Sequence, residues 1–365
     1  MTTSDTPRLA THVEIAPGFR ISRIIKGGWQ LAGGHGAVDR ALAIDDMIAF
    51  AEAGVTTFDC ADIYTGVEAL IGEFRRTYRG RYGASAAEQV RVHTKFVPDL
   101  GMLASLTPDD IAQAIDRSRE RLGVDAIDLV QFHWWDYGTP GYLNAALVLR
   151  ELQRMGKVRR VGATNFDTSH LRELLDTGVP IVSHQVQYSL LDRRASGAMA
   201  SLCAERGVGM LAFGALAGGF ISERWLGVPE PAERLENRSL VKYKLIIDEF
   251  GGWTLFQELL RTLSSIAARH GVGIGSVAIR WTLDQPAVAA TIVGSRHAAH
   301  LADTIAAYTL QLTARDGNEL SAVLARARGP GGDVYDLERD RDGAHGRIMR
   351  YNLSQVGTHG PAEGS

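Results

Sequence analysis

The chain has 365 residues, of which 45% are hydrophobic and 22% charged, and its formal net charge is −3. These proportions are typical of a soluble globular protein, and the near balance of acidic and basic side chains argues against a general affinity for nucleic acid or an anionic membrane. Two cysteines, Cys60 and Cys203, are too few for a disulfide framework or a zinc site of the usual kind. We therefore expect a cytoplasmic protein without a structural metal.

Residues 1–17 lack the basic start and apolar run of a secretory signal, so we expect them to form a short frayed leader. No run of about 18 apolar residues occurs anywhere in the chain, which argues against a membrane span. From about residue 19 onward, short apolar segments alternate with amphipathic helical patterns. This alternation is the signature of repeated βα units and a parallel sheet.

Eight strands are expected, each rich in Val, Ile, Leu or Phe as is usual for strands buried on both faces. They lie near 21–28, 55–60, 90–96, 126–133, 158–163, 181–187, 208–213 and 289–294. Eight βα units favour one α/β domain over residues 18–328, a closed (β/α)8 TIM barrel. The clearest helix is expected over 107–123, where Thr107 can cap and Gly123 can terminate.

A doubly wound open sheet is the structural alternative. Its glycine fingerprint for dinucleotides should follow the first strand and open a helix. The glycine-rich stretch at 27–36 has a different spacing and is better interpreted as a loop at the barrel rim. The sequence therefore favours the barrel.

Two segments fall outside the regular βα pattern. A long rim insertion after strand seven, at about 218–253, is expected to be functional, because long loops at active rims commonly are. Within it, residues 238–244 could close over a bound ligand. The C-terminal extension, 329–365, carries enough apolar side chains to dock in part, while 356–365 are expected to stay disordered.

The chemistry-bearing residues cluster at the ends of consecutive predicted strands. Asp59, Lys95 and His133 end strands two, three and four, and Tyr64 follows Asp59 by five positions. Catalytic residues of such barrels come from this rim. A cation beside a phenol favours the phenolate, so we expect Lys95 to lower the pKa of Tyr64 from about 10.

These four residues suggest a proton-donating site for carbonyl reduction. We hypothesise that Tyr64 is the general acid, that Asp59 holds Lys95 in place, and that His133 orients the substrate carbonyl by hydrogen bonding. Taken singly, each residue has a plainer interpretation. Asp59 and Lys95 could form a structural ion pair, and a lone histidine at a strand end is more often a core residue.

The surrounding segments resemble the aldo-keto reductase family. They are FDCADIY at 58–64, VHTKF at 92–96, LVQFHW at 129–134, GATNF at 162–166, HQVQYSLLDR at 184–193, AFGALAGGF at 212–220 and IVGSR at 292–296. The resemblance covers most of the chain. It implies a (β/α)8 barrel that uses a nicotinamide cofactor, without a metal, to interconvert carbonyl compounds and alcohols.

The resemblance also implies cofactor contacts. Asn165 and Gln185 would hold the nicotinamide carboxamide, and Phe213, where relatives more often have tyrosine, would stack on the ring. The loop that contains Gly214, Leu216 and Gly218 would approach the pyrophosphate. The 2′-phosphate of NADPH would be held by four residues after strand eight, and we expect NADPH in preference to NADH: Ser295, Arg296, His300 and Thr304. His300 and Thr304 depart from the usual family pattern.

Substrate contacts are expected from rim tryptophans, namely Trp29, Trp134 and Trp135, although packing alone could explain some of them. The leading hypothesis is an NADPH-dependent reductase of a small aldehyde or ketone, with Tyr64 as proton donor and hydride from nicotinamide C4. One alternative is an alcohol or sugar dehydrogenase running oxidatively with NAD or NADP. Another is a regulatory subunit that senses redox state through bound NADPH. The substrate, the direction of reaction and the oligomeric state stay open.

Overall fold

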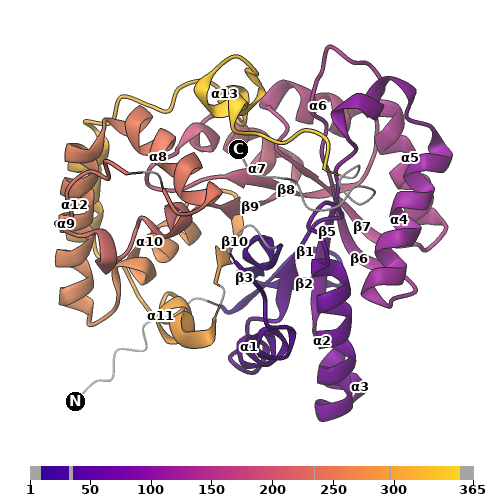
Figure 1. Cartoon of the computed structure of the whole chain (residues 1–365), viewed down its shortest axis with the longest axis horizontal. Helices are drawn as coiled ribbons and strands as arrows, with labels where there is room; N and C mark the ends of the chain where they lie inside the picture. The colour runs from indigo at the N-terminus through magenta and orange to yellow at the C-terminus, as the bar shows by residue number, and fades with distance from the viewer. Residues whose placement is uncertain (1–9, 33–35, 234, 296, 354–365) are drawn as a thin grey trace.

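A computed structural model describes residues 10–32, 36–233, 235–295 and 297–353. Its centre is a closed barrel of parallel strands in the order β10-β3-β4-β5-β6-β7-β8-β9 (Figure 1). The strands are β3 (Ile24–Gly27), β4 (Thr57–Asp59), β5 (Arg91–Phe96), β6 (Ile127–Phe132), β7 (Val158–Thr164), β8 (Ile181–Gln187), β9 (Gly209–Phe213) and β10 (Val288–Gly294). The eight strands and the barrel architecture predicted from the sequence are confirmed.

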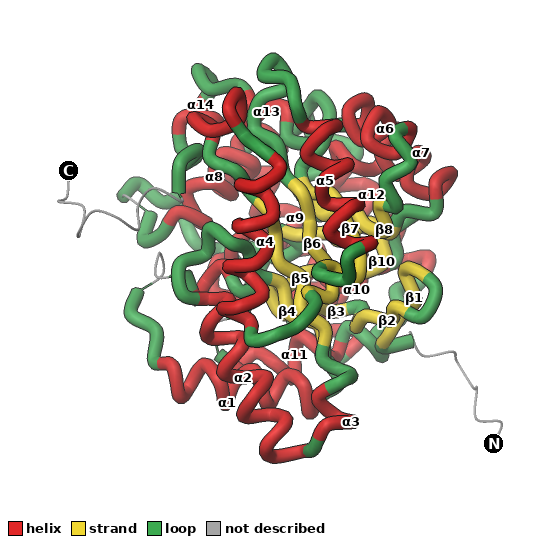
Figure 2. Tube along the Cα trace, turned by 90° about the vertical axis from the view of Figure 1, so that its right-hand side faces the viewer, coloured by secondary structure: helices red, strands yellow, loops and turns green. Residues whose placement is uncertain are grey.

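Helices enclose the strands on the outside, as the red ribbon around the yellow barrel shows in Figure 2. They are α1 (Arg40–Glu52), α2 (Val67–Tyr82), α3 (Ala84–Ala87), α4 (Pro108–Leu122), α5 (Tyr142–Arg154), α6 (Thr168–Asp176), α7 (Ala198–Arg206), α8 (Arg238–Phe250), α9 (Trp253–His270), α10 (Ile274–Leu283), α11 (Leu301–Ala306), α12 (Ala314–Leu324), α13 (Asp336–Arg339) and α14 (Ala344–Arg347). Among the shorter 3-10 turns, η1 (Trp29–Leu31) follows β3, and η3 (Arg194–Ser196) follows β8.

Helix α4 shows how local sequence sets these boundaries. Its first turn carries a capping box: the Thr107 hydroxyl accepts from the backbone N–H of Asp110, and the Asp110 carboxylate accepts from the backbone N–H of Thr107 at 2.9 Å. Gly123 ends the helix at φ 65, a left-handed conformation that favours glycine. The helix predicted over 107–123 is therefore confirmed.

A two-stranded antiparallel sheet, which the sequence pattern did not predict, precedes the barrel. Strands β1 (His12–Ala16) and β2 (Phe19–Ser22) are joined by a turn in which Gly18 has φ 69. Phe19 and Ile21 pack with residues from inside the barrel. The assignment of all of 1–17 to a frayed leader is thus wrong for 12–16. The Pro-Gly pair at 17–18 between two alternating segments was the available signal.

The insertion and the C-terminal extension are also more ordered than expected. The insertion contains helix α8, whose N-cap Asn237 accepts from the backbone N–H of Leu240 at 3.0 Å. Apolar side chains recur along one face of this helix and are buried. The extension runs through α13 and α14, which contact each other and lie side by side in Figure 2. The predicted disorder of 356–365 falls outside the described residues.

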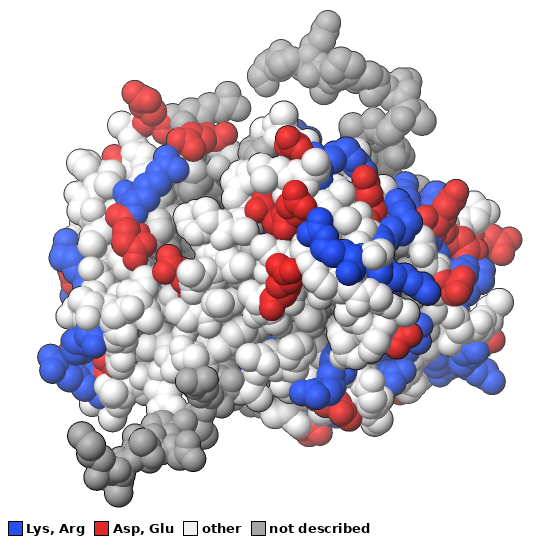
Figure 3. Space-filling model, turned by 90° about the horizontal axis from the view of Figure 1, so that it is seen from below, with Lys and Arg blue, Asp and Glu red and all other residues white. Residues whose placement is uncertain are grey.

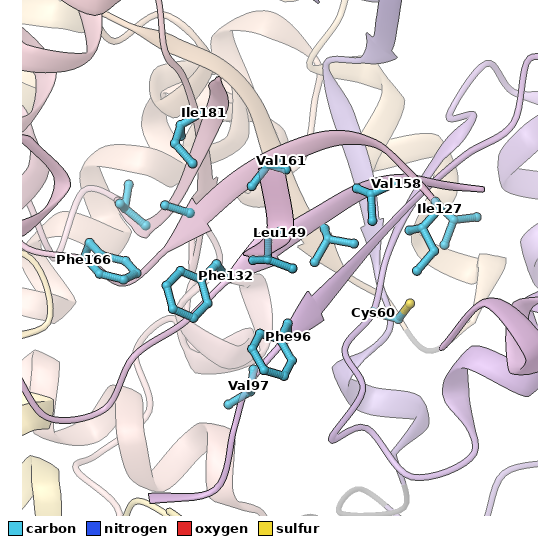
Figure 4. Packing of buried hydrophobic residues seen from close by; sticks show 14 of the residues in the cluster. Cys60, Phe96, Val97, Ile127, Phe132, Leu149, Val158, Val161, Phe166 and Ile181 are labelled. Carbon is cyan, nitrogen blue, oxygen red and sulfur yellow. The ribbon is translucent and has the colours of Figure 1, made fainter. Parts of the chain in front are cut away.

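A row of aromatic rings supports the strand ends that carry the predicted site. Phe96 at the end of β5 lies 6.0 Å from Phe132 at the end of β6, and Phe132 lies 5.6 Å from Phe166, measured between ring centroids (Figure 4). All three rings are buried. Because close-packed cores transmit even small changes, this row fixes the relative positions of neighbouring strand ends.

The surface carries both signs of charge. On the face drawn in Figure 3, Lys and Arg side chains are interspersed with Asp and Glu. Among the residues that the structure describes, we find no helix with the length and apolar character that a membrane crossing requires.

Candidate active site

The C-terminal ends of the barrel strands surround a cavity of about 410 Å³. The four residues predicted from the strand ends all line it: Asp59, Tyr64, Lys95 and His133. They come from β4, the loop after β4, β5 and the position after β6. The cavity therefore has the place and the ionisable groups that catalytic sites of such barrels have.

Asp59 and Lys95 form a buried ion pair at the floor of this cavity. The Lys95 ammonium donates to Oδ2 of Asp59 at 2.6 Å and to the carbonyl oxygen of Cys60 at 2.8 Å. Oδ1 of Asp59 accepts from the side-chain amides of Gln131 at 2.8 Å and Gln185 at 2.6 Å. Burial lowers the pKa of Lys95, but Asp59 and other neighbours raise it by more, so the ammonium stays charged.

Tyr64 lies beside this pair, with the Lys95 nitrogen 5.0 Å from the centroid of its ring. Burial raises the pKa of Tyr64, and the charge of Lys95 lowers it by less. The net direction is opposite to the one we expected, because the desolvation of a phenolate outweighs the nearby cation. The phenol therefore stays protonated at neutral pH, which is the form that can donate a proton.

His133 is neutral and has one defined tautomer. Burial, followed by the charge of Arg339, lowers the pKa of His133 to about 3. Its Nδ1 lies 3.2 Å from the carbonyl oxygen of Thr164, and because that oxygen can only accept, Nδ1 carries the hydrogen. Nε2 keeps a lone pair and has no partner among the described residues. Nε2 of His133 can therefore accept a hydrogen bond from a ligand. The sequence had instead predicted that His133 donates a hydrogen bond to the substrate carbonyl oxygen.

The residues expected to contact the nicotinamide ring or the pyrophosphate of the cofactor also line the cavity. They are Asn165, Gln185, Phe213, Gly214, Leu216 and Gly218. Asn165 has φ 62, which is uncommon outside glycine. Its Oδ1 is buried without a partner among the described residues, so it can accept from the N–H of a ligand amide.

The glycine loop after β9 is covered by the insertion. Gly214 and Gly218 have φ 87 and 64, and a Cβ at either position would clash with the ring of Tyr243. Arg238, Ser239, Lys242 and Tyr243, all from the first turns of α8, line the cavity. The segment 238–244, expected to close over a ligand, therefore forms part of the cavity wall.

Of the residues predicted for the 2′-phosphate, Ser295, His300 and Thr304 do not line this cavity. Ser295 is buried, and its hydroxyl donates to the carbonyl oxygen of His297 at 2.7 Å. The Thr304 hydroxyl donates to the carbonyl oxygen of His300 at 2.8 Å. Arg296 lies outside the described residues. The cavity reaches Gly294 at the end of β10, next to this group, whose role stays a prediction.

Two of the three predicted tryptophans lie at the cavity. The ring of Trp29 is 5.0 Å from that of Tyr64, and the ring of Trp135 is 4.3 Å from that of His133. Trp134 does not line the cavity. It is 1% exposed in the core, and its Nε1–H donates to the carbonyl oxygens of Asp136 and Thr139. The prediction that Trp134 contacts the substrate is therefore wrong, because its side chain packs in the core.

The cavity has a further wall that was not predicted from the sequence. It is made by the C-terminal extension, which we expected to dock but had not placed at the site: Tyr335, Ile348, Met349, Arg350 and Leu353. The ring of Tyr335 lies 5.6 Å from that of His133. No local periodicity marks these residues, because their contacts are with loops far away in the sequence.

A buried ionic network anchors this extension. Glu338 of α13 accepts from the guanidinium of Arg194 at 3.1 and 3.3 Å, and Lys242 lies 3.6 Å away. Arg194 also donates to Asp192 at 2.7 Å. Burial raises the pKa of Glu338, but Lys242 and Arg194 lower it by more, to about 2. The network joins the extension to the loop after β8 and to α8.

We expect Glu338→Gln to destabilise the protein at neutral pH, by an amount that shrinks in acid. A carboxylate pKa lowered from 4.5 to about 2 corresponds to roughly 3 kcal/mol of unfolding free energy. This contribution is present above about pH 4.5 and is lost as the pH falls through about 2, below which the glutamate is protonated in both states. Denaturant unfolding of both proteins across this range measures it. If the difference in unfolding free energy between the two proteins does not change with pH, Glu338 is not the ionised partner of Arg194 and Lys242.

No three His, Cys, Asp or Glu side chains within the described ranges come together as a metal site would require. Both cysteines are buried and unpaired, and burial raises the pKa of each thiol. The acid–base groups at the cavity include the phenol of Tyr64, the Lys95–Asp59 ion pair and the imidazole of His133, and Lys242, Tyr243 and Tyr335 line the same cavity.

Comparison with known proteins agrees with this geometry. The model of the aldo/keto reductase family matches residues 23–325. Flagellar radial spoke protein 5 of Chlamydomonas reinhardtii is 30% identical over 263 residues, which are 61% of this chain and 49% of that protein, so the chain spans about half of its length. The NADH-specific methylglyoxal reductase of Escherichia coli (strain K12) is 26% identical over 331 residues, covering 84% of this chain and 96% of that protein. The structure of a glycerol dehydrogenase from Gluconobacter oxydans matches with a TM-score of 0.72 at 22% identity, covering 88% of this chain and 98% of that one.

Proposed function

Because the chain belongs to the aldo/keto reductase family, we propose that it is an NADPH-dependent reductase of aldehydes or ketones in which Tyr64 donates the proton. Family membership and its oxidoreductase relatives make it an NAD(P)H-dependent enzyme acting on CH–OH or C=O groups. The observation that carries the finer proposal is the buried, protonated phenol of Tyr64 beside the Lys95–Asp59 ion pair at the cavity floor.

The cofactor's nicotinamide ring, when bound, supplies a hydride. Asn165 fits the carboxamide of that ring, because its buried Oδ1 is free to accept from an amide N–H. Phe213 lines the same cavity and offers an aromatic face for stacking. Gln185 holds Asp59 through its side-chain amide, so it links this side of the cavity to the ion pair.

Tyr64 transfers its hydroxyl proton to the carbonyl oxygen as the alcohol forms. Its burial keeps the phenol protonated until that moment, and the Lys95 ammonium then stabilises the phenolate that remains. The ammonium is itself fixed by Asp59 and by the carbonyl oxygen of Cys60. His133, neutral with a lone pair on Nε2, accepts a hydrogen bond from the hydroxyl of the alcohol.

The purified chain, incubated with NADPH and a panel of aliphatic and aromatic aldehydes and ketones, tests this proposal. We expect the absorbance of the reduced cofactor to fall while one alcohol forms for each NADPH consumed. The reverse assay, with the corresponding alcohols and NADP, tests the oxidative direction, which the acceptor Nε2 of His133 is also suited to. Tight NADPH binding without turnover in either direction would instead favour a redox-sensing subunit.

Cofactor preference needs a separate measurement. We expect NADPH to bind about tenfold or more tightly than NADH, since a charge-assisted hydrogen bond to the 2′-phosphate contributes about 1.5–3 kcal/mol. Arg296 and Ser295, at the end of β10, are the proposed contacts, and Arg296→Ala should remove most of the difference. Fluorescence titration with both cofactors measures it. Equal dissociation constants in the unmodified chain would reject the NADPH assignment, and the NADH-specific E. coli relative makes the comparison necessary.

A further inference from the structure

The wall of the cavity contributed by the C-terminal extension lies outside the part of the chain that the family model matches, which ends at residue 325. We call residues 333–353 the C-terminal segment. It is held by one residue ahead of α13 and by one within it. Asp333 accepts from the backbone N–H and the hydroxyl of Thr168 at 2.8 and 3.0 Å, and Glu338 pairs with buried Arg194.

Arg339, the last residue of α13, binds backbone carbonyl oxygens of two loops at the active site. The guanidinium of Arg339 donates through Nη1 to the carbonyl oxygen of Asn165 at 2.8 Å and through Nη2 to that of Trp134 at 2.9 Å. Its carbon also lies 4.2 Å from the ring centroid of Tyr137. A planar guanidinium presents its donors in one rigid fork, so it can hold two acceptors at a fixed separation, whereas the ammonium of lysine is a point charge on a flexible stem.

The two carbonyl oxygens belong to different loops, and each loop carries a residue of the proposed active site. Trp134 directly follows His133 after β6, and Asn165 follows β7. Asn165 has φ 62, a conformation that persists only where its surroundings hold it. Its backbone N–H donates to the carbonyl oxygen of Gln185 at 3.0 Å, and Arg339 holds its carbonyl oxygen. Arg339 therefore links the loop that carries His133 to the loop that carries Asn165 through two hydrogen bonds.

The same segment places a ring against the imidazole. Tyr335, immediately ahead of α13, is 4% exposed and has φ 66, again uncommon outside glycine. Its ring lies 5.6 Å from that of His133 and 5.3 Å from the guanidinium carbon of Arg339. Strained backbone of this kind at a cavity wall marks a position that the surrounding contacts define closely.

We propose that Arg339 is a positioning residue of this active site: by binding the carbonyl oxygens of Trp134 and Asn165 together, it sets where His133 and Asn165 stand relative to the substrate carbonyl and the nicotinamide ring. This inference rests on the proposed function. With Arg339 in this role, the active site depends on the C-terminal segment, which lies outside the region that the family model matches.

The full-length variants Arg339→Ala and Arg339→Lys test this role, with Arg341→Ala as the matched control. Arg341 is two positions further along, and its side chain is 57% exposed beside Asp136. We expect Arg339→Ala to lower kcat by about 10–10²-fold, since a misplacement of about 1 Å costs up to about 10²-fold. NADPH binding should weaken several-fold because Asn165 loses its backbone support. The kcat of Arg339→Lys should lie between that of Arg339→Ala and that of the unmodified chain. Arg341→Ala should keep the kcat and the NADPH affinity of the unmodified chain.

Guanidinium ion at low, non-denaturing concentration separates positioning from general stability. It should restore part of the lost kcat in Arg339→Ala, because the free ion can occupy the vacated position between the two carbonyls, and it should not raise kcat in Arg341→Ala. If Arg339→Ala does not fold, Arg339→Lys decides, since it keeps the charge and most of the volume. A reduced kcat in a folded Arg339→Lys supports the role.

Unchanged kcat and unchanged NADPH affinity in a folded Arg339→Ala or Arg339→Lys variant would overturn the inference. So would a loss that follows only the folded fraction and does not respond to guanidinium. Failure of the proposed function is distinguishable, because the unmodified chain would then turn over no carbonyl compound. The NADPH titration of the variants would in that case still report whether Arg339 supports Asn165.

Discussion

Tyr64→Phe is expected to lower kcat for carbonyl reduction by about 10²–10⁴-fold while leaving the dissociation constant of NADPH nearly unchanged. The substitution removes only the hydroxyl, so the ring still packs 5.0 Å from Trp29 and the Lys95–Asp59 pair is retained. Among the neighbouring described groups, His133 is neutral with its hydrogen on Nδ1, and the Lys95 ammonium is held by Asp59 and by the carbonyl oxygen of Cys60, so neither replaces the phenol as proton donor. Steady-state kinetics with cofactor titration measures both quantities.

The matched control is Tyr82→Phe, which removes a phenol that bonds to Glu52 on the outside of the barrel. This variant should keep the kcat and KM of the unmodified chain. Near-normal turnover in Tyr64→Phe would discard the proton-donor assignment. A loss of NADPH binding as large as the loss of turnover would instead assign Tyr64 a binding role.

The second large effect is expected from Lys95→Met, on both stability and activity. Removing one partner of a buried ion pair leaves the other charge uncompensated and typically costs about 3–5 kcal/mol of unfolding free energy. Both side chains of this pair are at most 7% exposed, and Asp59 would keep only the amides of Gln131 and Gln185 as donors. Turnover should fall as well, because the cation that lies next to Tyr64 and stabilises its phenolate would be lost.

Denaturant unfolding of Lys95→Met and of the double variant Asp59→Asn/Lys95→Met separates these two effects. The double variant removes the unpaired charge while keeping hydrogen-bonding capacity, so it should recover part of the lost stability but none of the turnover. Equal stability of Lys95→Met and the unmodified chain would show that the pair is not buried as described. Full activity in the double variant would remove the pair from the mechanism.

Most of the barrel could be predicted from the sequence because each strand is marked locally. A strand buried on both faces in a parallel barrel requires a short run of Val, Ile, Leu or Phe, and such runs stand out from the helical patterns between them. Asp59, Lys95 and His133 end three of these runs, so their meeting at one rim followed from topology alone.

The remaining features depend on contacts between distant residues, which no local pattern reveals. The hydrogen bond from Arg339 to the carbonyl oxygen of Asn165 spans 174 positions of sequence. Trp134 and Trp135 are adjacent and chemically identical, yet Trp135 lines the cavity while Trp134 is buried in the core. The protonation of Tyr64 depends on its burial, which its neighbours in sequence do not determine.

The coupling of hydride and proton transfer is best measured in a single turnover, with enzyme in excess over NADPH deuterated at C4 or undeuterated. Oxidation of the bound cofactor should produce one alcohol per NADPH, be slowed by deuterium, and slow by orders of magnitude in Tyr64→Phe. Bound NADPH that stays reduced across the whole carbonyl panel, or an oxidation rate that Tyr64→Phe does not change, would contradict the mechanism.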